Sequence, residues 1–262
     1  NLAKIHLHST NLYKSLEKET GQPTGFHETG SLRLAYKKED LQWFHYVKGI
    51  LDIAGSPCSI ISTDEIHKYH PFIKLDGILG AFYTPEDGYT DPTSTTNAMA
   101  KGARDNGAKI YRKNRVTDIE QLPNGEWKVI TEKGNITCEH VVNAAGSFCP
   151  EVSQMVGIKN VPSINMVHQY LVTESHPEIE KLDKELPVVR DPDSSSYLRQ
   201  EGKGLLIGPY EQDVAAWALD GMDWKFDMEL LEPDLDRIEK HLEKGMDRIP
   251  QFKDVGIKRI IC

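Results

Sequence analysis

The chain has 262 residues, 39% of them hydrophobic and 27% charged, so it can bury a substantial core and is not globally disordered. Its formal net charge of -9 argues against a nucleic-acid or anionic-membrane surface, because both require clustered Lys and Arg. No apolar run approaches the roughly 18 residues of a membrane span. We therefore expect an enzyme or a binding protein with no membrane span.

The four cysteines are widely spaced, and none forms a C-x-x-C pair. They are Cys58, Cys138, Cys149 and Cys262. This spacing indicates neither a zinc site nor a disulfide framework, so a reducing compartment is expected. The sequence starts at Asn1 without a methionine and ends on the apolar β pattern IKRIIC. Because domains seldom end on such a run, we expect the chain to be a piece of a longer protein.

Helical and β patterns alternate in the first part of the sequence. Apolar residues on one helical face predict a surface helix over residues 2–20, ended by Gly21. Several elements and a loop rich in turn residues follow. They are a strand at 31–35, a helix at 38–54, a short helix opening at Asp64 and ended by Pro71, a strand at 77–83 and the loop at 85–92.

The middle of the sequence continues with one helix and then several β-rich segments. Small residues favour a helix from Thr93 to Asn106, with Gly107 as its C-cap. The β-rich segments are residues 108–120, 127–131, 135–139 and 140–145. Glycines at the intervening turns favour a hairpin followed by a further strand.

After Gly157 the pattern changes to long β stretches, which favour a mostly antiparallel sheet. These stretches are residues 164–173, 195–199 and 205–210, followed by an amphipathic helix at 235–246 and a strand at 257–262. The chain is therefore predicted to pass from a mixed β sheet (31–90) through an α/β unit (91–160) into a second β region (161–262).

The segment VVNAAG (141–146) is typical of a buried strand that leads to a nucleotide. Its small residues would let a ligand approach the backbone, although they would equally permit tight packing of strand on helix. A glycine-rich phosphate loop is missing from the sequence. The only G-x-G, in EGKGLLIG (201–208), lies between two predicted strands and is therefore predicted to be a hairpin turn.

Two polar residues interrupt β patterns and have two possible readings each. His168 lies in MVHQYLV and is either a hydrogen-bonded sheet histidine or a functional one. Tyr197 lies in SYLRQ and either packs or presents its hydroxyl to a pocket. His67 and His70 have H-x-x-H spacing, but no third ligand accompanies them and Pro71 follows, so we expect no metal site.

Five stretches together resemble one family, the flavin-dependent amine dehydrogenases that act on dimethylglycine and sarcosine. They are TGFHETGSLRLA (24–35), GAFYTPEDGYTDP (80–92), VVNAAGSF (141–148), MVHQYLVTE (166–174) and YLRQEGKGLLIGPYE (197–211). The resemblance runs in order over nearly the whole chain. It is therefore more specific than any one of these motifs.

The resemblance implies an α/β (α+β) fold in which a glutathione-reductase-type FAD-binding domain is interleaved with a substrate domain built on an antiparallel sheet. Residues 1–30 and 91–160 would belong to the FAD domain, and residues 31–90 and 161–262 to the substrate domain. In this family the N-terminal Rossmann unit with its pyrophosphate loop precedes the part of the protein seen here. A region that binds tetrahydrofolate follows in the full-length members.

The resemblance also implies six site residues. Those on the FAD side are Val116, Ala145, Gly146 and Phe148. Phe148 departs from the family pattern, which commonly has a tryptophan near this point. His168 and Tyr197 match the histidine and tyrosine that line the substrate side of the flavin, which favours the functional reading of both.

The implied reaction is oxidative demethylation of an N-methylated glycine. Dimethylglycine would be converted to sarcosine by hydride transfer to flavin N5, and the one-carbon unit would be released as formaldehyde or passed to tetrahydrofolate. An electron acceptor such as an electron-transfer flavoprotein would be the partner. The bacterial cytoplasm or the mitochondrial matrix would be the location.

Three other functions fit the sequence. Sarcosine itself could be the substrate, since no local feature distinguishes the two amines. The chain could belong to a non-catalytic regulatory protein of the same build, like the regulatory subunit of pyruvate dehydrogenase phosphatase, although the presence of His168 and Tyr197 favours an enzyme. Finally, it could be an α/β domain that binds some other nucleotide.

Overall fold

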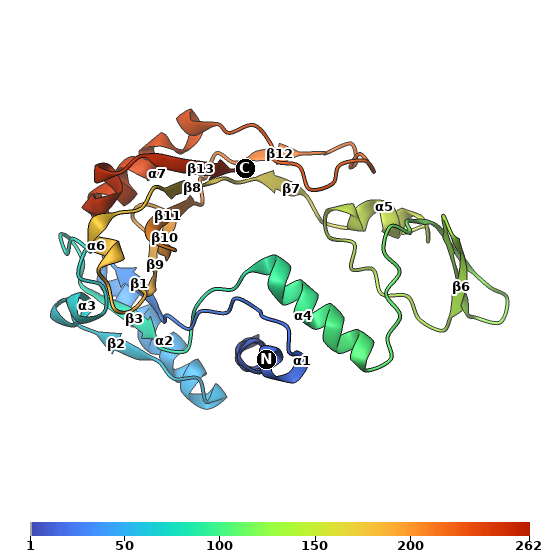
Figure 1. The fold of residues 1–262 in the computed structure, drawn as a ribbon, viewed down its shortest axis with the longest axis horizontal. Coiled ribbons are helices and arrows are strands. Elements are labelled where there is room, and N and C mark those ends of the chain that lie inside the picture. Colours follow the sequence, from blue (N-terminus) through green and yellow to red (C-terminus); the bar gives the residue numbers. More distant parts are fainter. Residues whose placement is uncertain (1) are drawn as a thin grey trace. The chain divides into compact units, whose positions relative to one another are not determined.

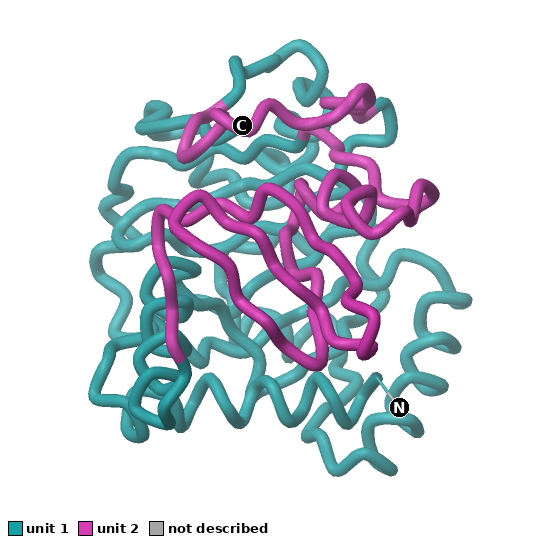
Figure 2. Tube along the Cα trace, turned by 90° about the vertical axis from the view of Figure 1, so that its right-hand side faces the viewer, with its two compact units in different colours: residues 1–108, 168–213, 231–262 teal, residues 109–167, 214–230 magenta. Residues whose placement is uncertain are grey.

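The structure is a computed structural model that describes residues 2–262, and it divides into two compact units (Figures 1 and 2). Unit 1 contains the chain up to Ala108 together with His168–Asp213 and Leu231–Cys262. Unit 2 contains Lys109–Val167 and Val214–Leu230. Each unit is therefore assembled from separate stretches of the sequence.

An eight-stranded sheet forms the centre of unit 1, with the strand order β13-β8-β11-β10-β9-β1-β3-β2. The strands are β1 (Ser31–Ala35), β2 (Ser59–Ile61), β3 (Gly80–Thr84), β8 (Tyr170–Thr173), β9 (Val188–Asp191), β10 (Ser196–Glu201), β11 (Gly204–Pro209) and β13 (Ile257–Ile261). All neighbouring pairs are antiparallel except β1 and β9, which are parallel. Strands from the β region predicted before residue 90 and most strands from the one predicted after residue 161 thus form one sheet.

The two faces of this sheet carry different apolar clusters. On the larger one, Leu34 and Leu198 pack with Ile66 of helix α3 (Thr63–Tyr69) and Ile238 of helix α7 (Leu235–Arg248), and all four are 0% exposed. On the smaller one, Phe44 of helix α2 (Lys38–Ala54) packs against Phe82 of β3. Because side chains alternate along a strand, polar residues next to Leu34 and Leu198 point away from the larger cluster.

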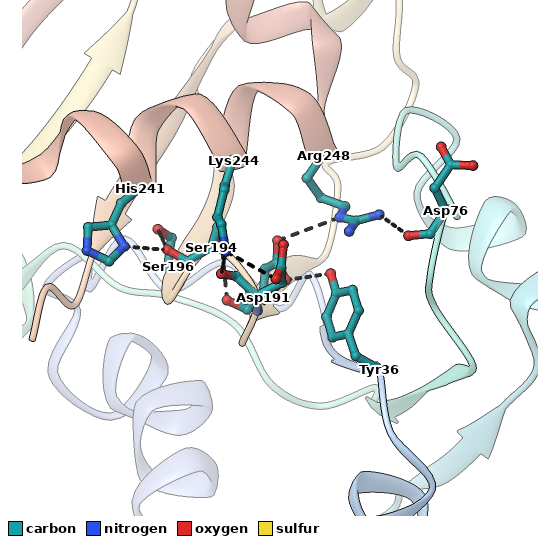
Figure 3. A network of polar contacts seen from close by, with 9 residues as sticks. Tyr36, Asp76, Asp191, Ser194, Ser196, His241, Lys244 and Arg248 are labelled. Atoms are coloured by element: carbon teal, nitrogen blue, oxygen red, sulfur yellow. Dashed lines mark hydrogen bonds and ion pairs between the residues drawn. The ribbon is translucent and has the colours of Figure 1, made fainter.

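A buried polar network fastens the end of α7 to the sheet (Figure 3). The Tyr36 hydroxyl donates to Asp191 Oδ1 at 2.6 Å, and Asp191 Oδ2 lies 3.6 Å from Arg248 Nε. Arg248 also donates to the carbonyl oxygens of Lys74 and Asp76. Asp191 is 2% exposed, so its charge is compensated within the protein rather than by water.

The remaining helices of unit 1 are α1 (Leu2–Thr20), α4 (Pro92–Asp105), the short α6 (Pro177–Glu180) and the 3-10 helix η2 (Pro250–Asp254). Helix α1 packs against α4, whose N-cap Asp91 accepts a hydrogen bond from Ser94 N–H. Within residues 2–262, no helix is both long and apolar enough to cross a membrane.

Unit 2 contains two small antiparallel sheets and two short helices. Their bounds are β4 (Val116–Gln121), β5 (Trp127–Thr131) and β6 (Gly134–Cys138) in one sheet, β7 (Asn165–Val167) and β12 (Ala215–Trp217) in the other, and η1 (Gly146–Phe148) and α5 (Cys149–Gln154). Strand β12 lies in the second excursion of the chain into this unit. The pairing of β7 with β12 joins that excursion to the first.

The structure confirms the mixed α/β fold class and most predicted elements, among them the 17-residue helix α2. Three β predictions were wrong in part. Residues 108–115 and 140–145 are not strands, since no described segment pairs with them, and Val142 is 85% exposed. The stretch 164–173 is two short strands, β7 and β8, which belong to different sheets.

Candidate functional site

His168 lies at the break between β7 and β8 and is the first residue of unit 1 after the chain leaves unit 2. Its neighbour Gln169 is buried, and the Gln169 amide donates to Asp234 O at 2.5 Å and accepts from Asp234 N–H at 3.0 Å. These two side-chain bonds tie Gln169, the neighbour of His168, to Asp234 at the N-terminus of α7. The imidazole itself is 39% exposed and can meet a ligand.

Tyr197 lies in β10 on the face opposite Leu198 and therefore points away from the larger cluster. It pairs across the strands with Gly208 of β11, and the ring lies over that glycine. A Cβ at Gly208 would lie 2.5 Å from the Tyr197 hydroxyl oxygen and closer still to two ring carbons. Gly208 thus provides the space that Tyr197 occupies.

Tyr210 brings the two predicted substrate residues together. Its ring is 5.7 Å from the His168 ring in an edge arrangement and 5.8 Å from the Tyr197 ring. Strand β11 ends at Pro209, and Tyr210 N–H then donates to Ser195 O at 2.7 Å, which directs the ring. His168, Tyr210 and Tyr197 form what we call the aromatic cluster.

Glu211, the next residue, contacts the imidazole of His168 at Nδ1. Its Oε2 is 3.0 Å from His168 Nδ1, and its Oε1 is 3.2 Å from Arg237 Nε of α7. The Glu211 side chain is only 1% exposed. Neither Tyr210 nor Glu211 is among the residues predicted from the sequence, although an aromatic and an acidic residue directly after a buried strand are a usable signal.

Burial raises the pKa of the Tyr197 phenol above its ordinary value, and the neighbouring Tyr210 adds to the rise. The positive charges of Arg199 and Arg190 act in the opposite direction. The phenol therefore remains protonated at neutral pH. It can donate a hydrogen bond to an anionic or lone-pair-bearing ligand while the imidazole of His168 offers a second polar contact.

In unit 2, the segment VVNAAGSF is organised by the Asn143 side chain. Its amide donates to Cys149 O and Ser153 Oγ, both at 2.9 Å, while its oxygen accepts from Ala145 N–H at 3.2 Å. Gly146 then takes a positive φ of 57°, which a glycine adopts without strain, and no atom lies within 4 Å of a Cβ built there. The space beside the Gly146 backbone is therefore open to a ligand.

Phe148 is part of a three-layer stack within unit 2. The Trp224 ring stacks on Phe148 at 4.9 Å with an interplanar angle of 9°, and the Arg115 guanidinium lies 5.5 Å from the Trp224 centroid. Arg115 directly precedes the half-buried Val116. The stack therefore contains one predicted cofactor residue, Phe148, and the chain neighbour of another, Val116. A groove of about 540 Å³ is lined by Arg115, Phe148, Trp224 and Lys113 among others.

The two histidines with H-x-x-H spacing do not share a site. His67 Nε2 is 2.7 Å from Ile73 O, and His70 is 0% exposed. In the part of the chain that the structure describes, no group of three His, Cys, Asp or Glu side chains could hold a metal ion.

The family model of FAD dependent oxidoreductases matches residues 1–261, and the chain therefore belongs to this family. Among curated proteins it is 42% identical over 266 residues to mitochondrial dimethylglycine dehydrogenase of Rattus norvegicus and 32% identical over 254 residues to mitochondrial sarcosine dehydrogenase of Mus musculus. These alignments cover 100% and 95% of the chain. The chain spans only 31% and 27% of the length of these relatives.

Among solved structures, the chain is similar to the L-proline dehydrogenase of P. horikoshii, with a TM-score of 0.79 and 26% identity. The match covers 98% of this chain and 65% of that one. The FAD-dependent oxidoreductase family inferred from the five sequence stretches is thus confirmed. The roles of the six predicted site residues stay predictions.

Proposed function

We propose that the protein containing this chain oxidises an N-methylated glycine, most simply dimethylglycine to sarcosine, with FAD as its cofactor. The observation that carries the proposal is the aromatic cluster, in which Tyr210 lies between His168 and Tyr197 in a chain of the FAD dependent oxidoreductase family. Identity to dimethylglycine dehydrogenase exceeds identity to sarcosine dehydrogenase, which favours dimethylglycine over sarcosine as the substrate.

The reaction explains why a histidine and a tyrosine belong together. Loss of hydride from an N-methyl carbon requires the nitrogen lone pair, so the ammonium form of the substrate must first lose its proton. His168 would accept that proton, and the protonated phenol of Tyr197 would orient the substrate. The resulting iminium adds water and separates into sarcosine and formaldehyde.

When bound, FAD supplies the acceptor for the hydride at its N5. The residues of unit 2 fit the adenosine end of such a cofactor, because the backbone is open at Gly146 and a groove lined by Phe148 has aromatic and cationic walls. We assign Val116, Ala145, Gly146 and Phe148 to that wall. Phe148 replaces the family's tryptophan, while Trp224 supplies an indole that stacks on it.

We also propose where the one-carbon unit and the electrons go. The one-carbon unit would leave as formaldehyde or pass to tetrahydrofolate, and the electrons would pass to an acceptor such as an electron-transfer flavoprotein. The named relatives are mitochondrial proteins, which favours the mitochondrial matrix if the source is a eukaryote and the cytoplasm if it is a bacterium.

The test is reduction of the complete, FAD-loaded protein by dimethylglycine and by sarcosine under anaerobic conditions. His168→Ala and Tyr197→Phe should each lower the rate of flavin reduction by about 100-fold or more while FAD content stays near that of the parent. Equal losses of rate and FAD content would show that the two residues are structural. A flavin-containing parent that neither amine reduces would exclude the enzyme and favour the regulatory alternative.

A further inference from the structure

We propose that Glu211 is the positioning residue for His168, because its carboxylate accepts a hydrogen bond from Nδ1–H of the imidazole and so leaves the lone pair on Nε2 for the substrate. This inference rests on the proposed function, since it names the residue that prepares His168 for its role there. Glu211 ends the stretch YLRQEGKGLLIGPYE, whose last two residues the sequence analysis left without a role.

The assignment of the proton follows from the donors and acceptors present. An ionised carboxylate only accepts hydrogen bonds, so a neutral imidazole 3.0 Å from Glu211 Oε2 must carry its single proton on Nδ1. Nε2 then holds the lone pair, and no described residue forms a hydrogen bond with Nε2. The His168 side chain is 39% exposed, so the imidazole is accessible to a ligand.

Contacts on both oxygens hold the Glu211 carboxylate in one position. Its side chain is 1% exposed, and Arg237 Nε lies 3.2 Å from the oxygen that does not face His168. Arg237 is in the first turn of α7, where its backbone N–H donates to the N-cap Asp234 at 3.2 Å. Asp234 in turn is bonded twice to Gln169, so both partners of Glu211 are anchored to the same short segment.

This geometry makes Glu211→Gln a specific perturbation. The guanidinium of Arg237 presents only donors, so the single oxygen of the glutamine amide is expected to face Arg237. The amide NH₂ group then faces His168 Nδ1, which must become an acceptor. The proton moves to Nε2, and the imidazole can no longer take a proton from the substrate through that atom.

The experiment compares three variants of the complete, FAD-loaded protein. Glu211→Gln changes the charge and retains the size, whereas Glu211→Asp retains the charge. Asp191→Asn is the matched control, because Asp191 is a buried carboxylate of the same unit that also pairs with an arginine (Figure 3). The contacts of His168 do not include Asp191. All three are compared by thermal unfolding and FAD content before the assays.

Two measurements test whether Glu211 sets the tautomer of His168. The first is the ¹⁵N spectrum of the imidazole in histidine-labelled protein, with the His168 signals identified from His168→Ala. It should show the Nδ1–H tautomer in the parent, in Glu211→Asp and in Asp191→Asn, and the Nε2–H tautomer in Glu211→Gln. The second is the rate of flavin reduction at saturating dimethylglycine, which should fall about 100-fold in Glu211→Gln with little change in the dissociation constant. Glu211→Asp should recover most of that loss.

The same tautomer in the parent and in Glu211→Gln would overturn the proposal. An equal loss of rate in Glu211→Gln and Asp191→Asn would also overturn it, because the effect would then be one of general stability. If neither amine reduces the parent protein, the proposed function fails, whereas the tautomer measurement still decides the role of Glu211.

Discussion

Gly208→Ala is expected to act on the site solely by displacing Tyr197. The added methyl would lie 2.5 Å from the phenol oxygen and closer still to two ring carbons. Since non-bonded heavy atoms rest about 3.5 Å apart, the ring must move by about 1 Å or more. The φ of Gly208 is not positive, so alanine introduces no backbone strain there.

A displacement of about 1 Å in a group that orients the substrate can lower the rate about 100-fold. We therefore expect Gly208→Ala to slow flavin reduction by roughly that factor while FAD content is retained. The assay is stopped-flow reduction by dimethylglycine in the parent, Gly208→Ala, Tyr197→Ala and the double variant. Gly49→Ala is the matched control, since a Cβ at that helical glycine meets no atom within 4 Å.

The double-mutant cycle tests whether Gly208→Ala acts through the Tyr197 ring. If the methyl acts through the Tyr197 ring, Gly208→Ala should cost almost nothing once that ring is gone. Additive losses in the double variant would mean that the methyl disturbs the sheet rather than Tyr197. A Gly208→Ala protein as fast as the parent would mean that the position of the ring does not matter.

Two further predictions concern the stability of unit 1. Burial lowers the pKa of His70 to about 3 in the folded protein, whereas the pKa of a histidine in the unfolded chain is about 6.5. As the pH falls from about 6.5 towards about 3, the unfolded chain therefore binds a proton that the folded protein does not bind, and the free energy of unfolding decreases. The resulting loss between pH 8 and pH 5 is about 2 kcal/mol, and His70→Leu should remove that part of the shift in urea midpoint. Asp191→Ala would leave Arg248 and Tyr36 without their buried partner and should cost about 3–5 kcal/mol in urea unfolding. Replacing Arg248 by Met and Tyr36 by Phe in the same protein should recover much of that loss, and no recovery would contradict the pairing.

The elements that could be predicted from the sequence are those whose signals are local. Helix α2 has an apolar face, and Gly55 at its end adopts the left-handed conformation with a φ of 80°. The hairpin of β10 and β11 has its turn at Gly202, as the EGKG pattern predicts. In both cases the determining residues lie within one or two turns of the element, so no distant contact was needed.

The predictions that were wrong depend on partners far away in the sequence. HVVNAA has the composition of a strand, but a strand also requires a neighbour that bonds to its backbone, and no described segment provides one for Val142. INMVHQYLVT divides near His168 because β7 pairs with β12 whereas β8 pairs with β11 and β13, and the Gln169 side chain at the break bonds to Asp234, 65 residues later. Composition and periodicity contain no information about that contact.

For the candidate site, residues and their resemblance to a family identified His168 and Tyr197, whereas geometry was needed to find what holds them. The chain passes from unit 2 to unit 1 between Val167 and His168, and it returns to unit 2 after Asp213, two residues beyond Glu211. The bond between His168 and Glu211 therefore ties together two of the points at which the chain changes units.

A residue at such a crossing would ordinarily follow the backbone of a connecting segment, which is more mobile than a strand. Here the buried carboxylate, Arg237 and the Gln169 amide hold His168 to the rigid sheet and α7 instead. The imidazole thus combines an exposed position with a fixed direction, which a residue inside either strand could not have. That combination is what a group that accepts a substrate proton requires, and it gives a reason for the break between β7 and β8 to fall where it does.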